Sequence, residues 1–120
     1  EISHHQDNPD NFGKLTVIDQ WEVQQFANLL EQLDAVEDVD GTTLLDNSLL
    51  FFSSEISDGN AHNHNDMPIL LAGKGGGDIS SGRHIAYNDE PSVAKLFVAM
   101  LNTVGVDVNE FGDDSGALTI

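Results

Sequence analysis

Two short apolar runs lie between two longer amphipathic stretches, and this order constrains the fold more than any other feature of the chain. The runs are SLLFFSS at 48–54 and MPILLAG at 67–73. Pro68 stands at the beginning of the second run, where the missing N–H costs a sheet least. Continuous apolar runs of this length predict two strands that are covered on both faces.

The flanking stretches predict two helices, over about 12–36 and 93–104, because their apolar residues recur at helical spacing. In the first stretch these residues are Leu15, Ile18, Phe26, Leu29, Leu30, Leu33 and Val36. NPD at 8–10 is a start signal for the first helix, and Gly105 is placed to end the second. Glu22 interrupts the first apolar stripe, so we expect it to be a buried, hydrogen-bonded carboxylate.

Three further segments complete the chain. RHIAY at 83–87 predicts a third strand, GKGGG at 73–77 predicts a flexible turn, and the acidic tail from Val106 predicts irregular structure. Short apolar strands between amphipathic helices favour an α/β fold. We therefore expect one layered α/β/α domain over residues 1–120, with a mixed sheet flanked by two main helices.

The charge of the chain restricts its partners. There are 21 acidic residues against four basic ones, for a formal net charge of −17. Such a surface repels phosphate backbones, which argues against nucleic-acid binding. The acidity fits either a cation-rich environment or a chain that binds cations. Cysteine is absent, which excludes disulfides and thiolate metal sites. No apolar run approaches the roughly 18 residues of a membrane span.

The loop between the two predicted strands, EISDGNAHNHND at 55–66, holds the densest group of candidate ligands. His62 and His64 are two residues apart, so in extended backbone both imidazoles point to the same side. Carboxylates at Glu55, Asp58 and Asp66 accompany them. Imidazole with carboxylate suits zinc, manganese or iron better than calcium. The alternative is a solvated loop that is rich in Asn, Asp and His because it turns.

Three other motifs carry weaker signals. The loop resembles a calcium-binding loop but lacks the glycine at its sixth position and the glutamate at its twelfth. GKGGG matches neither a Walker A loop nor a dinucleotide-binding fingerprint, so a turn is favoured over a phosphate cradle. Serines at 53, 54 and 57 lack the GxSxG turn of a hydrolase nucleophile.

Taken together, SHHQDNPDNFGKLTVIDQW, GTTLLDNSLLFFSSEISDGNAHNHNDMPILLAGKGGG and GRHIAY resemble the C-terminal part of domain-of-unknown-function family 1552, a family of exported bacterial proteins. The resemblance covers nearly the whole chain, and SDGNAHNHNDMPILLAG is its most specific part. That family is distantly similar to the alkaline phosphatase and sulfatase superfamily. The resemblance implies a three-layer α/β/α fold and a site for one or two metal ions.

The resemblance also implies particular ligands. The superfamily's C-terminal half supplies an Asp/His pair before a long helix, an acid after the next strand and a histidine before the following one. Here the pair falls on His5, with His4 beside it, and the acid on Glu55, with Asp58 as a second candidate. The later histidine falls on His62, with His64 as its competitor. The Asp of the pair is absent from this chain.

The function implied by the resemblance is the metal-binding portion of a phosphatase- or sulfatase-like hydrolase. It would use zinc or manganese, act on a small anionic ester and work outside the cytoplasm, although no signal peptide is recognisable in the sequence. The superfamily's N-terminal half, which carries the nucleophile, has no counterpart here, so we expect a fragment of a longer protein. The alternative is a non-catalytic acidic domain that binds cations or a partner within a larger exported protein.

Overall fold

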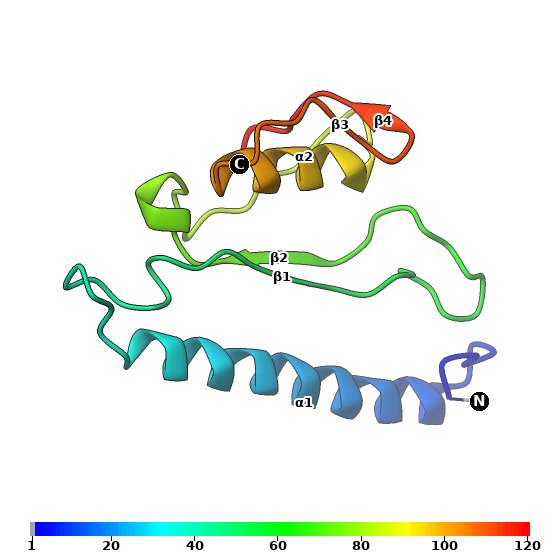
Figure 1. Cartoon of the computed structure of the whole chain (residues 1–120). Helices are drawn as coiled ribbons and strands as arrows, with labels where there is room; N and C mark the ends of the chain where they lie inside the picture. Colours follow the sequence, from blue (N-terminus) through cyan, green and yellow to red (C-terminus); the bar gives the residue numbers. More distant parts are fainter. Residues whose placement is uncertain (1) are drawn as a thin grey trace.

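The first element is helix α1 (Pro9–Asp34), one of two helices in this computed structural model, which describes residues 2–120. The elements that follow are β1 (Leu50–Ser53), β2 (Ile69–Ala72), the short 3-10 helix η1 (Gly75–Gly77), α2 (Val93–Thr103), β3 (Glu110–Phe111) and β4 (Asp114–Ser115) (Figure 1). The described residues thus mix two helices with two small antiparallel sheets, which is compatible with the predicted α/β class.

Helix α1 begins at Pro9 because Asn8 caps it. The Asn8 side chain accepts a hydrogen bond of 2.9 Å from the backbone N–H of Asp10. Proline suits the first helical position, since the N–H that it lacks has no partner within the helix. At the other end the N–H of Ala35 donates to the carbonyl of Glu31 at 3.1 Å. The predicted start signal is therefore confirmed, and the helix starts a little earlier than its apolar stripe.

No residue of α1 is buried, although the helix carries a long apolar stripe. Phe26 stacks on Phe52 of β1 with ring centroids 4.9 Å apart, while Trp21 is 63% exposed. The prediction that Glu22 is a buried carboxylate is wrong, because its side chain is exposed. The physical reason is that a sheet of two short strands covers only part of one side of a 26-residue helix.

Strands β1 and β2 form an antiparallel ribbon, with Leu50 opposite Ala72 and Ser53 opposite Ile69. Adjacent side chains of a strand point to opposite faces. Phe52 accordingly packs against α1, and Phe51 makes an edge-to-face contact with Phe97 of α2 at 5.3 Å. The two helices therefore lie on opposite faces of the ribbon (Figure 1).

The expected mixed sheet is not found, since both strand pairs within residues 2–120 are antiparallel. The chain returns from β1 to β2 through the loop at 54–68, which contains no crossover helix. A parallel pair needs such a crossover, whereas an antiparallel pair needs only a loop. The prediction of a third strand at 83–87 is also wrong. Residues 83–87 form no strand, and the hydroxyl of Tyr87 instead donates to the carbonyl of Thr119 at 3.1 Å.

Helix α2 holds most of the buried apolar side chains. Ala94, Leu96, Val98 and Ala99 are buried on it, and Ile79 joins them. Ser92 caps the start of α2 by accepting a hydrogen bond from the N–H of Ala94, and Gly105, at a φ of +82°, follows its end as predicted. Neither helix among the described residues has the length and hydropathy needed to cross a membrane.

The tail contains a hairpin that the sequence interpretation missed. Strands β3 and β4 pair Phe111 with Asp114, and Gly112 between them has a φ of +63°. Gly-Asp between two strand residues is a hairpin signal, but each strand here is only two residues long. The hairpin forms because Phe111 packs edge-to-face on Phe97 at 5.2 Å, which is a tertiary contact.

The glycine-rich segment forms a tight turn tied to the residues before β1. Backbone N–H groups of Gly75 and Gly76 donate to the carbonyls of Ser48 and Asp46 at 3.0 and 2.9 Å. These two donors are therefore engaged within the protein, as expected of a turn rather than a phosphate cradle. Lys74 adds an ion pair, with Nζ 2.6 Å from Oδ1 of Asp46.

This ion pair makes the stability of the fold depend on pH. Lys74, and after it the backbone N–H of Thr43, lowers the pKa of Asp46 below its ordinary value of 3.8. A lowered pKa means that the stabilisation is complete above pH 3.8 and disappears as pH falls through the folded-state value. We expect the melting temperatures of wild type and Asp46→Asn to differ above pH 3.8 and to converge below it. Asp19→Asn, at an exposed carboxylate of α1, is the control, and a constant Asp46 difference at every pH would contradict the prediction.

Candidate site where the N-terminal segment meets the β1–β2 loop

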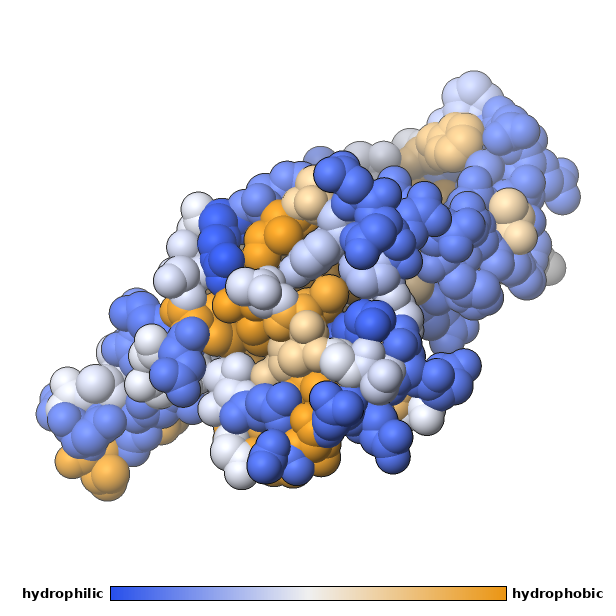
Figure 2. All heavy atoms as spheres, turned by 90° about the horizontal axis from the view of Figure 1, so that it is seen from above, coloured by the Kyte–Doolittle hydropathy of each residue, from blue (hydrophilic) through white to orange (hydrophobic). Residues whose placement is uncertain are grey.

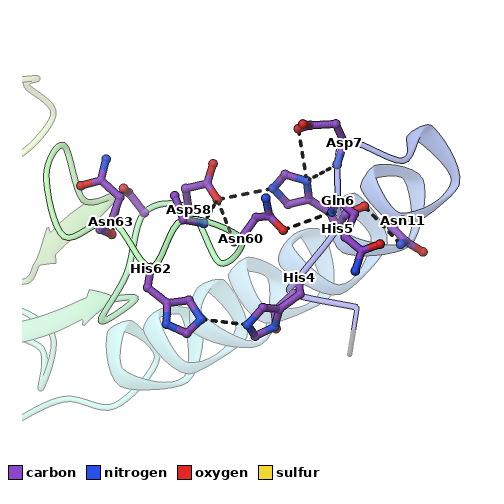
Figure 3. Close-up of polar contacts among 12 residues, drawn as sticks. His4, His5, Gln6, Asp7, Asn11, Asp58, Asn60, His62 and Asn63 are labelled. Carbon is purple, nitrogen blue, oxygen red and sulfur yellow. Dashed lines mark hydrogen bonds and ion pairs between the residues drawn. The ribbon is translucent and has the colours of Figure 1, made fainter.

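The N-terminal segment (residues 2–8) lies against the loop between β1 and β2 (residues 54–68), although they are far apart in the sequence (Figures 1 and 3). The backbone N–H of Gln6 donates to Oδ1 of Asn60 at 3.3 Å. Two pairs of functional side chains also face each other across this contact (Figure 3). The contact thus brings together the two segments that carry the candidate ligand histidines.

Asp58 organises the loop side of the contact. Its Oδ1 accepts hydrogen bonds from the backbone N–H groups of Asn60 at 2.7 Å and Ala61 at 2.9 Å. These N–H groups lower the pKa of Asp58, with a smaller contribution from His5. The carboxylate therefore stays ionised and fixes the turn that presents His62.

Gly59 allows the two segments to approach closely. A Cβ atom at this position would lie 2.6 Å from the carbonyl oxygen of Ser3, nearer than real Cβ atoms come to other heavy atoms. The residue has no positive φ, so only this proximity opposes a side chain there. Glycine is therefore needed at position 59 because the N-terminal segment passes close to it, and not because of the loop's own backbone conformation.

His5 anchors the N-terminal segment. It is the one buried polar side chain within residues 2–120, at 7% exposure, and its ring lies 4.4 Å from that of Phe12. Its Nδ1 accepts a hydrogen bond from the N–H of Asp7 at 3.1 Å, which leaves the ring proton on Nε2. That nitrogen lies 3.5 Å from Oδ1 of Asp58. Both nitrogens of His5 are thus engaged, and neither is directed at His62.

His4 and His62 form the closest pair of potential ligands. Their Nε2 atoms are 2.8 Å apart, and their rings meet edge to face at 66° with centroids 4.9 Å apart (Figure 3). Both side chains are exposed. Two nitrogens at this distance either share one proton or direct their lone pairs at a common cation. The sequence interpretation had placed His4 only beside His5, because nothing local pairs it with a residue in the distant loop.

His64 points elsewhere. Its Nδ1 lies 2.9 Å from the backbone carbonyl oxygen of Glu55, to which it donates. His62 has a φ of +53°, so the backbone between the two histidines is not extended. The expectation that the imidazoles of His62 and His64 share one side is therefore wrong. Glu55 contributes a carbonyl to this contact, and its side chain is exposed to water.

The four residues predicted as a ligand set are thus distributed over three separate contacts. His62 meets His4, His5 meets Asp58, and His64 meets the backbone of Glu55. Within the part of the chain that the structure describes, no group of three or more His, Asp or Glu side chains is arranged to hold a metal ion. The arrangement of residues 2–120 supplies two converging imidazoles.

Comparison with known proteins finds no relative of this chain. No family model, no curated protein and no solved structure matches the chain. The resemblance to family 1552 therefore stays a prediction. The interpretation of the site rests on the geometry of the histidine pairs.

Proposed function

We propose that the chain binds a divalent transition-metal ion through Nε2 of His4 and Nε2 of His62. The observation that supports this proposal is the 2.8 Å separation of these two nitrogens in a chain with a net charge of −17. Tetrahedral zinc, with bonds of about 2.0–2.1 Å to nitrogen, holds two such ligands about 3.3 Å apart. The rings would have to part by about half an ångström, which is possible because both side chains are exposed.

We further propose that this ion belongs to a phosphatase- or sulfatase-like hydrolase with an α/β/α fold related to alkaline phosphatase, exported from the cell. A bound zinc or manganese ion lowers the pKa of a coordinated water and stabilises charge on a phosphoryl or sulfuryl oxygen. Residues of the chain would position the two ligands, since Asp58 fixes the turn before His62 and His5 anchors the segment that carries His4. A small anionic ester would be the substrate.

Titration calorimetry with zinc and with manganese tests metal binding. We expect His4→Ala and His62→Ala each to weaken binding by about 100-fold or more, since removing even an outer partner of a metal ligand costs about 10- to 100-fold. His84→Ala is the matched control, because His84 is exposed and lies outside both segments. Affinity should also fall on acidification, because protons compete with the metal ion for ligating imidazoles. Absence of binding by wild type, or equal affinity in all three variants, would contradict the proposal.

Hydrolysis is tested separately with chromogenic phosphate and sulfate esters. We expect turnover that requires added metal and disappears on chelation. Metal binding without turnover, in this chain and in any longer protein that contains it, would favour the alternative function. That alternative is a non-catalytic acidic domain, and it is favoured by the finding that residues 2–120 supply only two converging imidazoles.

A further inference from the structure

The N-terminal segment (residues 2–8) is held on the loop between β1 and β2 by polar contacts. Apart from His5, every side chain of this segment is exposed, and the segment contains neither helix nor strand. Figure 2 shows mostly hydrophilic side chains at the right-hand end of the molecule, where Figure 1 places the segment and the loop. The polar contacts between them join Gln6 with Asn60, His5 with Asp58 and His4 with His62. Exposed polar contacts contribute little to stability, so the segment is among the parts of the fold that open most easily.

The docked segment also holds two residues in an unfavourable backbone conformation. Gln6 has a φ of +50° and Asp7 a φ of +54°, a left-handed region that residues with a side chain rarely adopt. Both positions therefore cost free energy for as long as the turn before α1 is kept. A segment released from the loop can relax to negative φ. The strain thus favours release and opposes the polar contacts.

The two proposed metal ligands lie on opposite sides of this contact. His4 belongs to the segment and His62 to the loop, 58 residues later, and their Nε2 atoms are 2.8 Å apart in the docked arrangement. Release of the segment separates the two nitrogens. The released chain therefore offers the metal ion single imidazoles, whereas the docked chain offers a pair.

We propose that the metal ion is a latch, which fixes the N-terminal segment on the β1–β2 loop when it binds and releases the segment when it is removed. This inference rests on the proposed metal site at His4 and His62. A ligand that binds only one of two states stabilises that state by a factor that grows with the ligand concentration divided by Kd. Such coupling is reciprocal, so a docked segment also strengthens metal binding. The availability of the metal ion thus regulates the position of the segment.

Amide hydrogen exchange at Gln6 tests the latch, because the N–H of Gln6 donates to Oδ1 of Asn60 across the contact at 3.3 Å. The probe is zinc alone, added to the full chain at constant pH and at about ten times the Kd that calorimetry gives. At this concentration we expect exchange at Gln6 to slow by about tenfold, since only the docked state presents both imidazoles. Leu118 is the control amide, because its N–H donates to the carbonyl of Lys95 at 3.1 Å, outside the contact. Its exchange should not respond to zinc.

Two variants connect the effect to the ligands. In His4→Ala the slowing at Gln6 should be lost, because the segment no longer carries a ligand. His84→Ala is the matched control and should keep the slowing, since His84 is exposed and lies outside both the segment and the loop. Circular dichroism checks that both variants are folded.

Calorimetry and hydrogen exchange together separate the latch from the metal site. Zinc binding that requires His4 and His62 but leaves exchange at Gln6 unchanged would overturn the latch and leave the site standing. Equal slowing at Gln6 and Leu118 would also overturn the latch, because zinc would then stabilise the whole fold rather than the segment. Absence of zinc binding would overturn the latch together with the proposed function.

Discussion

Gly73→Ala is expected to destabilise the fold by about 3–5 kcal/mol, a large part of the total stability of a typical domain. Gly73 follows β2 with a φ of +93°, a conformation that residues with a side chain rarely adopt. A Cβ atom there would also collide with the carbonyl oxygen of Ser48. That carbonyl accepts the hydrogen bond from Gly75, so moving it would disturb the tie between the glycine turn and the residues before β1.

Gly76→Ala provides the matched control for this prediction. Gly76 also has a positive φ, +77°, but a Cβ atom there would meet nothing within 4 Å. We therefore expect Gly76→Ala to lower the free energy of unfolding by only about 1 kcal/mol, which is the cost of placing alanine at a positive φ. Urea denaturation of both variants measures the difference. Equal losses would mean that the proximity to Ser48 is unimportant.

Gly59→Ala is expected to lower zinc affinity by about tenfold or more without altering any ligand, since groups that position metal ligands typically contribute 10- to 100-fold. The methyl group would meet the carbonyl of Ser3 and displace the N-terminal segment, so that His4 would move away from His62. The prediction rests on the proposed metal site. Gly59→Ala should also have an effect that can be measured without metal, because the hydrogen bond from the N–H of Gln6 to Asn60 should be lost.

Calorimetry and amide hydrogen exchange at Gln6 measure the two effects in one variant. Gly13→Ala in α1 is the control, since a Cβ atom there meets nothing within 4 Å and alanine favours a helix. If exchange at Gln6 became faster while zinc affinity stayed unchanged, the N-terminal segment would have moved without any effect on metal binding. This result would count against the His4–His62 site. Unchanged exchange would count against the role assigned to Gly59.

Local signals in the sequence anticipated most of the secondary structure. The cap at Asn8, the two apolar stripes and Gly105 place the helices, because capping and helical periodicity act within a few residues. The apolar runs likewise place β1 and β2. The segment at 83–87 was predicted wrongly, since strand propensity without a neighbouring strand gives no pairing.

The site was anticipated only in its composition. The sequence pointed to histidines and acids in two segments, and both segments do meet in the structure. It assigned His64 to the side of His62, because it could not show that a positive φ turns the backbone between them. It also treated His4 as secondary to His5, whose two nitrogens are engaged in anchoring the segment.

The sequence by itself thus determined the two helices, the two apolar strands, the acidic surface and the histidine-rich segments, since composition and short-range periodicity are properties of neighbouring residues. Only the tertiary structure decided that the strands pair as an antiparallel ribbon between the helices, that Glu22 is exposed, and that His4 meets His62. The physical reason is distance along the chain. His4 and His62 are joined by the close approach of Gly59 to Ser3 and by the anchoring of His5 at Asp58, and neither contact leaves a local pattern in the sequence.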